Sequence, residues 1–332
     1  MPRLFDAIQI PGTALRLRNR VVMPPMNMDD AGPGGVVTDE VIEHYVARAQ
    51  GGVGLIIVAA AYVRDDGKLS RNQLGISRDE HVEPLSRLAK AIKERGAAAA
   101  IQIHHAGGVA DAETIGGTAV APSAEGFPDR DVKELSVQEI RELVEAFGAA
   151  AARAKAAGFD AVELHGAHGY LVTQFLSPAT NRRDDDYGGT SEKRLRFALE
   201  CVDAIRKATG QDYPIITRIS AKEDAPGGLT IEDGCRIAKA LDDAGACIVH
   251  VSASLASTGE RGWGYMVPLA EAVKRAVSVP VIAVGKLHDP KLANSVIEEG
   301  KADLVAIGSQ LLAQPDWPQA AAEALGQEMK PL

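Results

Sequence analysis

The chain has 332 residues, of which 46% are hydrophobic and 4% aromatic, and its formal net charge is −9. This apolar fraction is enough for a large core, which Val, Ile, Leu and Ala must fill because aromatic residues are so few. The negative charge argues against nucleic acid or an anionic membrane as the main partner. The N-terminus begins with no apolar signal stretch, and no apolar run reaches the length of a membrane span, so we expect a cytoplasmic protein.

The cysteines indicate the same compartment. Cys201, Cys235 and Cys247 are an odd number and lie in apolar or helical surroundings. A reducing environment suits them, with the thiols acting as small core residues. They form no close-spaced cluster, so we expect no iron–sulfur centre.

A unit recurs along the chain: a short β-branched run, a loop and an Ala-rich amphipathic stretch. The predicted strands are residues 20–26, 54–60, 98–104, 161–165, 215–220, 247–252, 281–285 and 303–308. The predicted helices follow them at residues 40–50, 81–95, 137–157, 191–209, 231–244, 266–277, 290–299 and 317–325.

Apolar strands that alternate with helices predict an α/β fold with a parallel sheet covered by helices. Eight such units predict closure into a (β/α)8 TIM barrel, here as one domain over residues 1–332. An open doubly wound sheet is the alternative, and it would want an early Gly-x-Gly-x-x-Gly at a strand-to-helix turn. The glycines of residues 51–54 precede a strand instead, and they fit a loop that ends a helix.

Two segments lie outside this repeat. Residues 4–10 and 15–17 flank a Pro-Gly-Thr turn and predict a short hairpin that caps the barrel floor. The long stretch 106–135 follows the third strand and contains two adjacent glycines and two prolines. We expect it to be a loop or lid over the barrel mouth.

Residues 162–170 are the most informative segment, because an alternating apolar run leads into His165, His168 and Tyr170. In barrels of this kind the chemistry is placed at the C-terminal ends of the strands. Two neutral imidazoles can donate hydrogen bonds to one oxygen atom, and a nearby phenol can supply a proton. Reduction of an activated C=C bond needs these groups, with hydride arriving from elsewhere.

The same spacing has two other interpretations. Residues three apart on a helix face the same way, so His165 and His168 could form a metal pair, or they could be two core histidines. The metal interpretation lacks a nearby third ligand at zinc spacing. This segment by itself leaves the choice between catalysis and these alternatives open.

The ends of the seventh and eighth predicted strands carry a second signal. Gly285 and Lys286 follow one strand, and Gly308 and Ser309 follow the other. Glycine lets a backbone N–H approach an anion closely, and barrels often bind phosphate between these two loops. The pair therefore predicts a phosphorylated ligand, although each glycine could simply turn the chain.

Two polar residues interrupt apolar strands. Gln102 alternates with isoleucines, so its side chain points to the opposite face, where it could pair with the amide-like edge of a pyrimidine ring. Arg218 lies inside an apolar run, where an unpaired arginine is costly. A ring that becomes anionic on reduction would supply its acceptor, and a structural salt bridge is an equally good explanation.

Taken together, the chain resembles the old yellow enzyme family of flavin mononucleotide (FMN) oxidoreductases over nearly its whole length. The resemblance rests on the segments 17–23, 51–57, Gln102 with 105–107, 162–170, 174–178, 181–184, 186–189, 218–220 and 302–308. The stretch from residue 161 to residue 189 is the most specific of them.

The resemblance implies FMN at the barrel mouth, reduced by NADH or NADPH, and an enone or enal as the small-molecule substrate. Gln102 would pair with the pyrimidine edge of FMN, Arg218 would face its N1 and C2 carbonyl, and Gly285, Lys286, Gly308 and Ser309 would hold its phosphate. His165 and His168 would bind the substrate oxygen, and Tyr170 would donate the proton. The residues implied beside the isoalloxazine are Pro24, Pro25, Met26, Asn27 and Ala60.

Three positions depart from the family pattern. Asn27 stands where Cys or Thr is common beside the flavin, Ser309 replaces the usual Arg, and Gly108 replaces the usual Arg or Lys. The predicted function is nevertheless an FMN-dependent ene-reductase, compatible with a homo-oligomer and with no bound metal. The alternatives are a metal-dependent barrel hydrolase or lyase that uses His165 and His168, and a flavin-binding barrel with little turnover.

Overall fold

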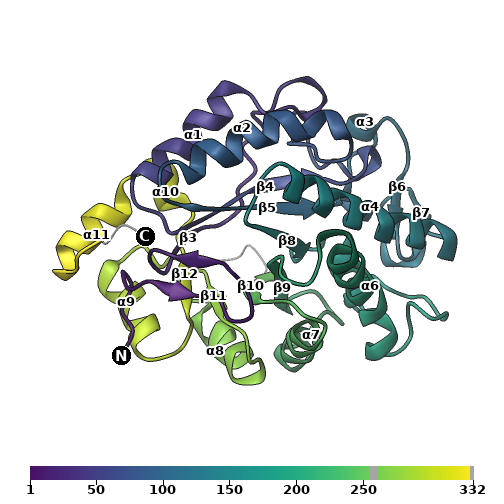
Figure 1. Cartoon of the computed structure of the whole chain (residues 1–332). Helices are drawn as coiled ribbons and strands as arrows, with labels where there is room; N and C mark the ends of the chain where they lie inside the picture. The colour runs from purple at the N-terminus through teal and green to yellow at the C-terminus, as the bar shows by residue number, and fades with distance from the viewer. Residues whose placement is uncertain (255–260, 330–332) are drawn as a thin grey trace.

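The computed structural model describes residues 1–254 and 261–329. Within this part of the chain, eight parallel strands close into a barrel in the order β3-β4-β5-β8-β9-β10-β11-β12, with β12 pairing back onto β3 (Figure 1). The predicted TIM barrel is therefore confirmed. The barrel strands are β3 (Val21–Met23), β4 (Leu55–Tyr62), β5 (Ala98–His104), β8 (Ala161–Gly166), β9 (Ile215–Glu223), β10 (Ile248–Ser254), β11 (Val281–Ala283) and β12 (Leu304–Ala306).

Helices surround the barrel (Figure 1). The long ones are α1 (Asp39–Gln50), α2 (Val82–Lys93), α4 (Val137–Ala156), α6 (Ser191–Thr209), α7 (Ile231–Asp243), α8 (Val267–Ala276), α9 (Pro290–Glu298) and α11 (Trp317–Leu325). Shorter pieces are α3 (Ala112–Ile115), α5 (Leu171–Leu176) and α10 (Ser309–Ala313), and the 3-10 turns η1 (Pro33–Gly35), η2 (Asp65–Gly67), η3 (Asp79–His81), η4 (Gly107–Val109) and η5 (Ala124–Gly126).

Local sequence explains where the long helices begin and end. The hydroxyl groups of Thr38, Ser136 and Thr190 each accept a hydrogen bond from a first-turn N–H, at the starts of α1, α4 and α6. Gly210 ends α6 with φ +87°, a conformation that L side chains rarely adopt. The eight long helices predicted from sequence agree with the observed ones within two residues at each end.

The first, seventh and eighth strands are shorter than predicted. The first ends at Met23 rather than at residue 26, because Pro24 and Pro25 have no N–H to donate to a neighbouring strand. The seventh ends at Ala283, since Gly285 and Lys286 have φ of +111° and +53° and leave the β region. The eighth covers Leu304–Ala306 instead of 303–308.

The N-terminal hairpin is confirmed. β1 (Ile8–Gln9) pairs antiparallel with β2 (Arg16–Leu17). Ile10 and Leu17 are buried in one hydrophobic cluster with Leu55, Ile216 and other residues from the N-terminal ends of the barrel strands. The hairpin therefore covers the floor of the barrel and leaves the opposite end for a ligand.

The segment 106–135, called the lid below, has more structure than the loop we expected. It contains α3 and a parallel pair of short strands, β6 (Ala119–Ala121) and β7 (Val132–Glu134), which lie beside α4 and α6 in Figure 1. Its apolar side chains form a small core of their own, separate from the barrel core. This lid core consists of Ala106, Ala110, Ala119, Ala121, Phe127 and Val132. The local pattern was too short to indicate these strands, because each spans three residues.

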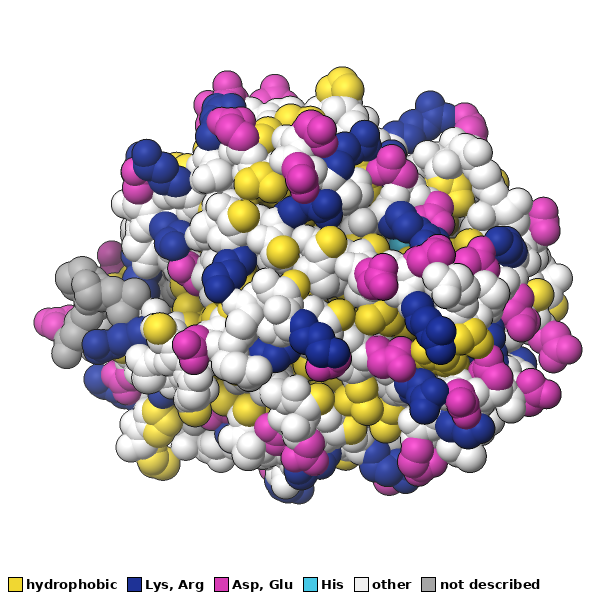
Figure 2. Space-filling model, turned by 45° about the vertical axis from the view of Figure 1, so that its right-hand side comes forward, with side chains coloured by type: hydrophobic (Ala, Val, Ile, Leu, Met, Phe, Trp, Pro, Cys, Tyr) yellow, Lys and Arg dark blue, Asp and Glu magenta, His cyan; other side chains and the backbone are white. Residues whose placement is uncertain are grey.

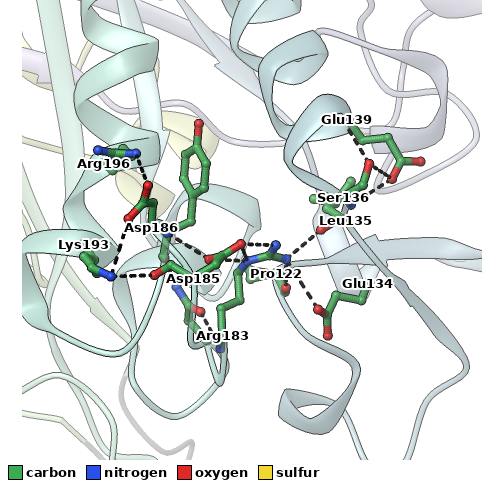
Figure 3. A network of polar contacts seen from close by, with 12 residues as sticks. Pro122, Glu134, Leu135, Ser136, Glu139, Arg183, Asp185, Asp186, Lys193 and Arg196 are labelled. Carbon is green, nitrogen blue, oxygen red and sulfur yellow. Dashed lines mark hydrogen bonds and ion pairs between the residues drawn. The ribbon is translucent and has the colours of Figure 1, made fainter.

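Arg183 fastens the lid to the barrel. Its guanidinium donates to the carbonyl oxygens of Pro122 and Leu135, which directly follow β6 and β7, at 2.6 Å each (Figure 3). Asp185 holds the guanidinium from the other side, with Nη2 at 2.6 Å from Oδ2. A second clamp is Gln174, whose amide accepts from the N–H of Gly108 and donates to the carbonyl of Ala106.

Figure 2 shows basic and acidic side chains interspersed over one face of the molecule. Within the described residues, no helix is both long enough and apolar enough to cross a lipid bilayer.

Candidate active site

A cavity of about 680 Å³ opens at the C-terminal ends of β3, β10, β11 and β12. The predicted site residues in its wall are Pro24, Pro25, Met26, His168, Arg218, Gly285, Lys286, Gly308 and Ser309. A second cavity of about 710 Å³ lies on the outer surface beside α4 and α6, among charged side chains of both signs. We place the active site in the first cavity and not in this surface cavity, because the polar residues at the strand ends line the first one.

The two glycines of the predicted phosphate end differ in the free space around them, which is small at Gly285 and ordinary at Gly308. A Cβ atom on Gly285 would lie 3.1 Å from Met266, and one on Gly308 would lie 3.5 Å from the sulfur of Met26. The Nζ atom of Lys286 donates to the backbone carbonyl of Arg261 at 2.8 Å. Arg261 and His288 also line the cavity, so this end gathers several groups that can face a phosphate.

Arg218 projects from β9 into the cavity wall and is 9% exposed. Its Nε atom is buried without a hydrogen-bond partner, and no carboxylate in the described part of the chain lies within ion-pair distance. Burial lowers the pKa of Arg218, an effect that the charge of Glu163 opposes. The structural salt bridge considered above is therefore not what holds Arg218, and an acceptor on a ligand would satisfy it.

His165 and His168 lie side by side, with ring centroids 5.2 Å apart. The N–H of Ala167 donates to Nδ1 of His165, so the ring hydrogen of a neutral His165 sits on Nε2. Burial lowers the pKa of His168 to about 3, and burial together with His168 lowers the pKa of His165 well below its usual value. Both imidazoles are therefore neutral at pH 7 and can act as hydrogen-bond donors without carrying a charge.

Two serines that the sequence analysis missed support His168. The hydroxyl of Ser252 lies 2.7 Å from Nε2 of His168, and the hydroxyl of Ser220 accepts from the backbone N–H of the same residue. His168 has φ +62°, which is uncommon for a non-glycine residue, so these contacts hold a turn that is otherwise unfavourable.

Tyr170 lies between the histidines and the lid. Its ring centroid is 5.0 Å from that of His165 and 4.5 Å from that of His104, and its ring packs against the lid core. Burial raises the pKa of Tyr170, so the phenol keeps its proton at neutral pH. His104 was also missed by the sequence analysis: it is fully buried and neither ring nitrogen has a hydrogen-bond partner among the described residues.

The remaining predicted residues lie outside the wall of this cavity. The amide of Asn27 is exposed and donates to the hydroxyl of Ser70 at 3.1 Å. Ala60 lies in an irregular stretch of the β4–β5 pairing, and its carbonyl accepts from Gln73 at 2.8 Å. Gln102 points into the barrel, as predicted, and donates to Glu163.

The departure at Gly108 has a local explanation. A Cβ atom there would lie 2.8 Å from the ring of Phe127 in the lid. A side chain at this position would therefore have to displace the ring of Phe127.

Among the described residues, no three His, Cys, Asp or Glu side chains are placed to hold a metal ion together. The metal-dependent interpretation of His165 and His168 needs such a third ligand.

The comparison with known proteins identifies the family. The sequence matches the NADH:flavin oxidoreductase / NADH oxidase family over residues 3–328. The chain belongs to this family. The resemblance to old yellow enzymes is thus confirmed, and with it FMN as cofactor and a nicotinamide as reductant.

Individual relatives agree. The chain is 45% identical over 342 residues to the NADH oxidase of Thermoanaerobacter brockii, and 99% of the chain matches 52% of that protein. It is 43% identical over 329 residues to the NADPH dehydrogenase of Geobacillus sp. (strain WCH70), with 97% of this chain and 94% of that protein covered. The chain therefore spans about half the length of the first relative and nearly all of the second.

A solved structure of morphinone reductase in complex with tetrahydroNAD has the same fold. The two structures superpose with a TM-score of 0.82 at 30% sequence identity, and the match covers 99% of this chain and 92% of the morphinone reductase chain. The residues in the cavity wall fit FMN, because the buried Nε of Arg218 lacks an acceptor that the electron-rich edge of the flavin would supply, and Gly285, Lys286 and Gly308 line the end where a phosphate would lie.

Proposed function

We propose that this flavin oxidoreductase is an ene-reductase, which reduces the C=C bond of α,β-unsaturated carbonyl compounds at the expense of NADPH or NADH. The observation that carries the proposal is the group of His165, His168 and Tyr170, two neutral imidazoles and a protonated phenol in mutual contact at the end of β8. The names of the relatives support a nicotinamide as reductant.

Bound FMN would accept hydride from the nicotinamide and pass it to the β carbon of the substrate. His165 and His168 would donate hydrogen bonds to the carbonyl oxygen, on which negative charge develops. Preorganised donors of this type each contribute ~3–4 kcal/mol to barrier lowering where comparable ones have been removed. Tyr170 would then protonate the α carbon, and the lid packed on its ring would keep water away from that step.

Residues at the flavin would have distinct tasks in this proposal. Arg218 would face the N1 and C2 carbonyl edge, and Gln102 the pyrimidine edge. Pro24, Pro25, Met26, Asn27 and Ala60 would lie along the isoalloxazine, and Gly285, Lys286, Gly308 and Ser309 would hold the phosphate.

The test is a two-stage anaerobic titration of the purified holoenzyme. NADPH or NADH should bleach the flavin absorbance, and 2-cyclohexenone should restore it with formation of cyclohexanone. Bleaching without recovery on addition of any enone would favour a flavin-binding barrel with little turnover. A colourless protein whose hydrolytic activity is lost with a chelator would favour the metal-dependent alternative.

A further inference from the structure

Three buried polar side chains meet inside the barrel below the strand ends. Glu163 of β8 and His250 of β10 are fully buried, and Gln102 of β5 is 2% exposed. The Nε2 atom of Gln102 donates to Oε1 of Glu163 at 2.7 Å, and Nδ1 of His250 lies 2.6 Å from Oε2. Both carboxylate oxygens of Glu163 are thus taken by residues from two other strands.

This arrangement fixes the orientation of the Gln102 amide. An ionised carboxylate only accepts hydrogen bonds, so Gln102 must turn its NH₂ group toward Glu163. The amide oxygen Oε1 is then the atom that Gln102 can present to a ligand. A site that presents an acceptor selects a ligand edge that carries an N–H donor, because an edge without one leaves a buried group unpaired.

The same carboxylate acts on Arg218. Burial lowers the pKa of His250, so its imidazole brings no positive charge to the carboxylate of Glu163. Arg218 is paired in register with His250 across β9 and β10. Burial lowers the pKa of Arg218, and the charge of Glu163 opposes that effect. The positive field of Arg218 toward a ligand is therefore partly offset from within the barrel.

We propose that Glu163 is a positioning residue for the cofactor: through Gln102 it selects a ligand with an N–H at the pyrimidine edge, and through Arg218 it lowers the reduction potential of bound FMN. His250 holds the second oxygen of Glu163 and so keeps the carboxylate in place. This inference rests on FMN binding, and it does not require that the oxidising substrate be an enone.

The first test measures the midpoint potential of bound FMN by spectroelectrochemistry in Glu163→Gln. Loss of the negative charge leaves Arg218 less opposed, so FMN should become easier to reduce by at least tenfold in its equilibrium constant. For a two-electron couple, tenfold corresponds to about 30 mV upward. The matched control is His250→Asn, which retains the carboxylate and a donor to it and should change the constant less than threefold.

The second test uses N3-methyl-FMN, which lacks the N–H, and apoprotein prepared by removing FMN. Wild-type apoprotein should bind the analogue at least tenfold more weakly than FMN, as quenching of flavin fluorescence would report. In Glu163→Gln the new amide can both donate and accept, so the amide of Gln102 can turn and the discrimination should fall by at least threefold.

Several outcomes would overturn the proposal. One is an equilibrium constant for FMN reduction within twofold of wild type in folded, FMN-loaded Glu163→Gln, and another is equal binding of FMN and N3-methyl-FMN by the wild type. If Glu163→Gln does not fold, the double variant Gln102→Leu/Glu163→Met removes both polar partners and should raise the potential in the same direction. Neither measurement contains an enone, so failure of the proposed ene-reductase activity would leave both results interpretable.

Discussion

The Nε2 atom of His168 lies 2.7 Å from the hydroxyl oxygen of Ser252, so a residue of β10 holds an imidazole that follows β8. If the serine donates, Nδ1 of the neutral imidazole keeps its hydrogen and can donate it to a substrate oxygen. The contact with Ser252 therefore determines which ring nitrogen of His168 can donate a hydrogen bond to a ligand.

We predict that Ser252→Ala weakens binding of a para-substituted phenol to the oxidised enzyme about fivefold, the equivalent of one lost hydrogen bond of about 1 kcal/mol. Titration of the charge-transfer absorbance measures the affinity. Ser254→Ala is the matched control, since that hydroxyl contacts Ser220 at 3.0 Å and is not bonded to His168. Equal loss in both variants would place the effect in strand packing instead.

Tyr170→Phe should separate the two half-reactions. If Tyr170 supplies the proton, reoxidation of the flavin by an enone should slow by about 10²–10⁴-fold, the usual contribution of a positioned acid. Reduction by the nicotinamide needs no proton from this residue and should change little. Stopped-flow measurement resolves the two steps, and quinones, which need no protonation at carbon, serve as the control acceptor. An equal fall in both steps would show that Tyr170 shapes the pocket.

Arg183→Ala should loosen the lid. The substitution leaves the carboxylate of Asp185 and two carbonyl oxygens without their donor, and the side chain of Arg183 is only 7% exposed. Because Asp185 is 31% exposed and still accepts from the N–H of Tyr187, the main loss is that of the donor to the two carbonyl oxygens. Leaving such groups without their donor costs about 1–3 kcal/mol, so we expect a loss of that order in the free energy of unfolding and faster proteolysis within residues 106–135.

The control for the lid is Arg196→Ala. Arg196 also pairs with a carboxylate of the same segment, Asp186 at 3.4 Å, but its side chain is 46% exposed (Figure 3). Exposed pairs contribute about 0–1 kcal/mol, so this variant should keep the stability and the protease resistance of the wild type. Equal effects of the two substitutions would contradict the clamp.

His104 should make the folded protein sensitive to acid. Burial lowers its pKa to about 3, whereas an unfolded histidine titrates near 6.5. Between these values the unfolded chain binds a proton that the folded chain does not, so stability falls as the pH decreases through this window, by about 1.4 kcal/mol per pH unit for one such group.

The variant His104→Leu removes this contribution. Its free energy of unfolding, measured with urea, should fall less steeply than that of the wild type between pH 6.5 and pH 4. The slope should not vanish, because the pKa of His168 is also lowered to about 3. Parallel curves for the two proteins would mean that His104 is protonated in the folded state or is already neutral when unfolded.

Much of the architecture could be predicted from the amino-acid sequence, because it depends on local patterns. Short β-branched runs followed by Ala-rich amphipathic stretches indicated each barrel unit, and the strand-end position of Gly285 and Gly308 indicated one end of the cavity. The alternation that turns Gln102 inward also turns Glu163 and His250 inward, so their position inside the barrel follows from the same pattern.

Local patterns in the chain were enough to predict the barrel strands and long helices, their order and which side chains face the barrel axis, since these follow from backbone periodicity and turn residues. Which of the inward side chains meet depends on how the strands are arranged in space. Glu163 and His250 are 87 residues apart, and β9 separates their strands. Their contact depends on strand register and on the curvature of a closed barrel, which no local pattern encodes. The clamp from Arg183 to Pro122 and Leu135 is likewise a consequence of packing between distant segments.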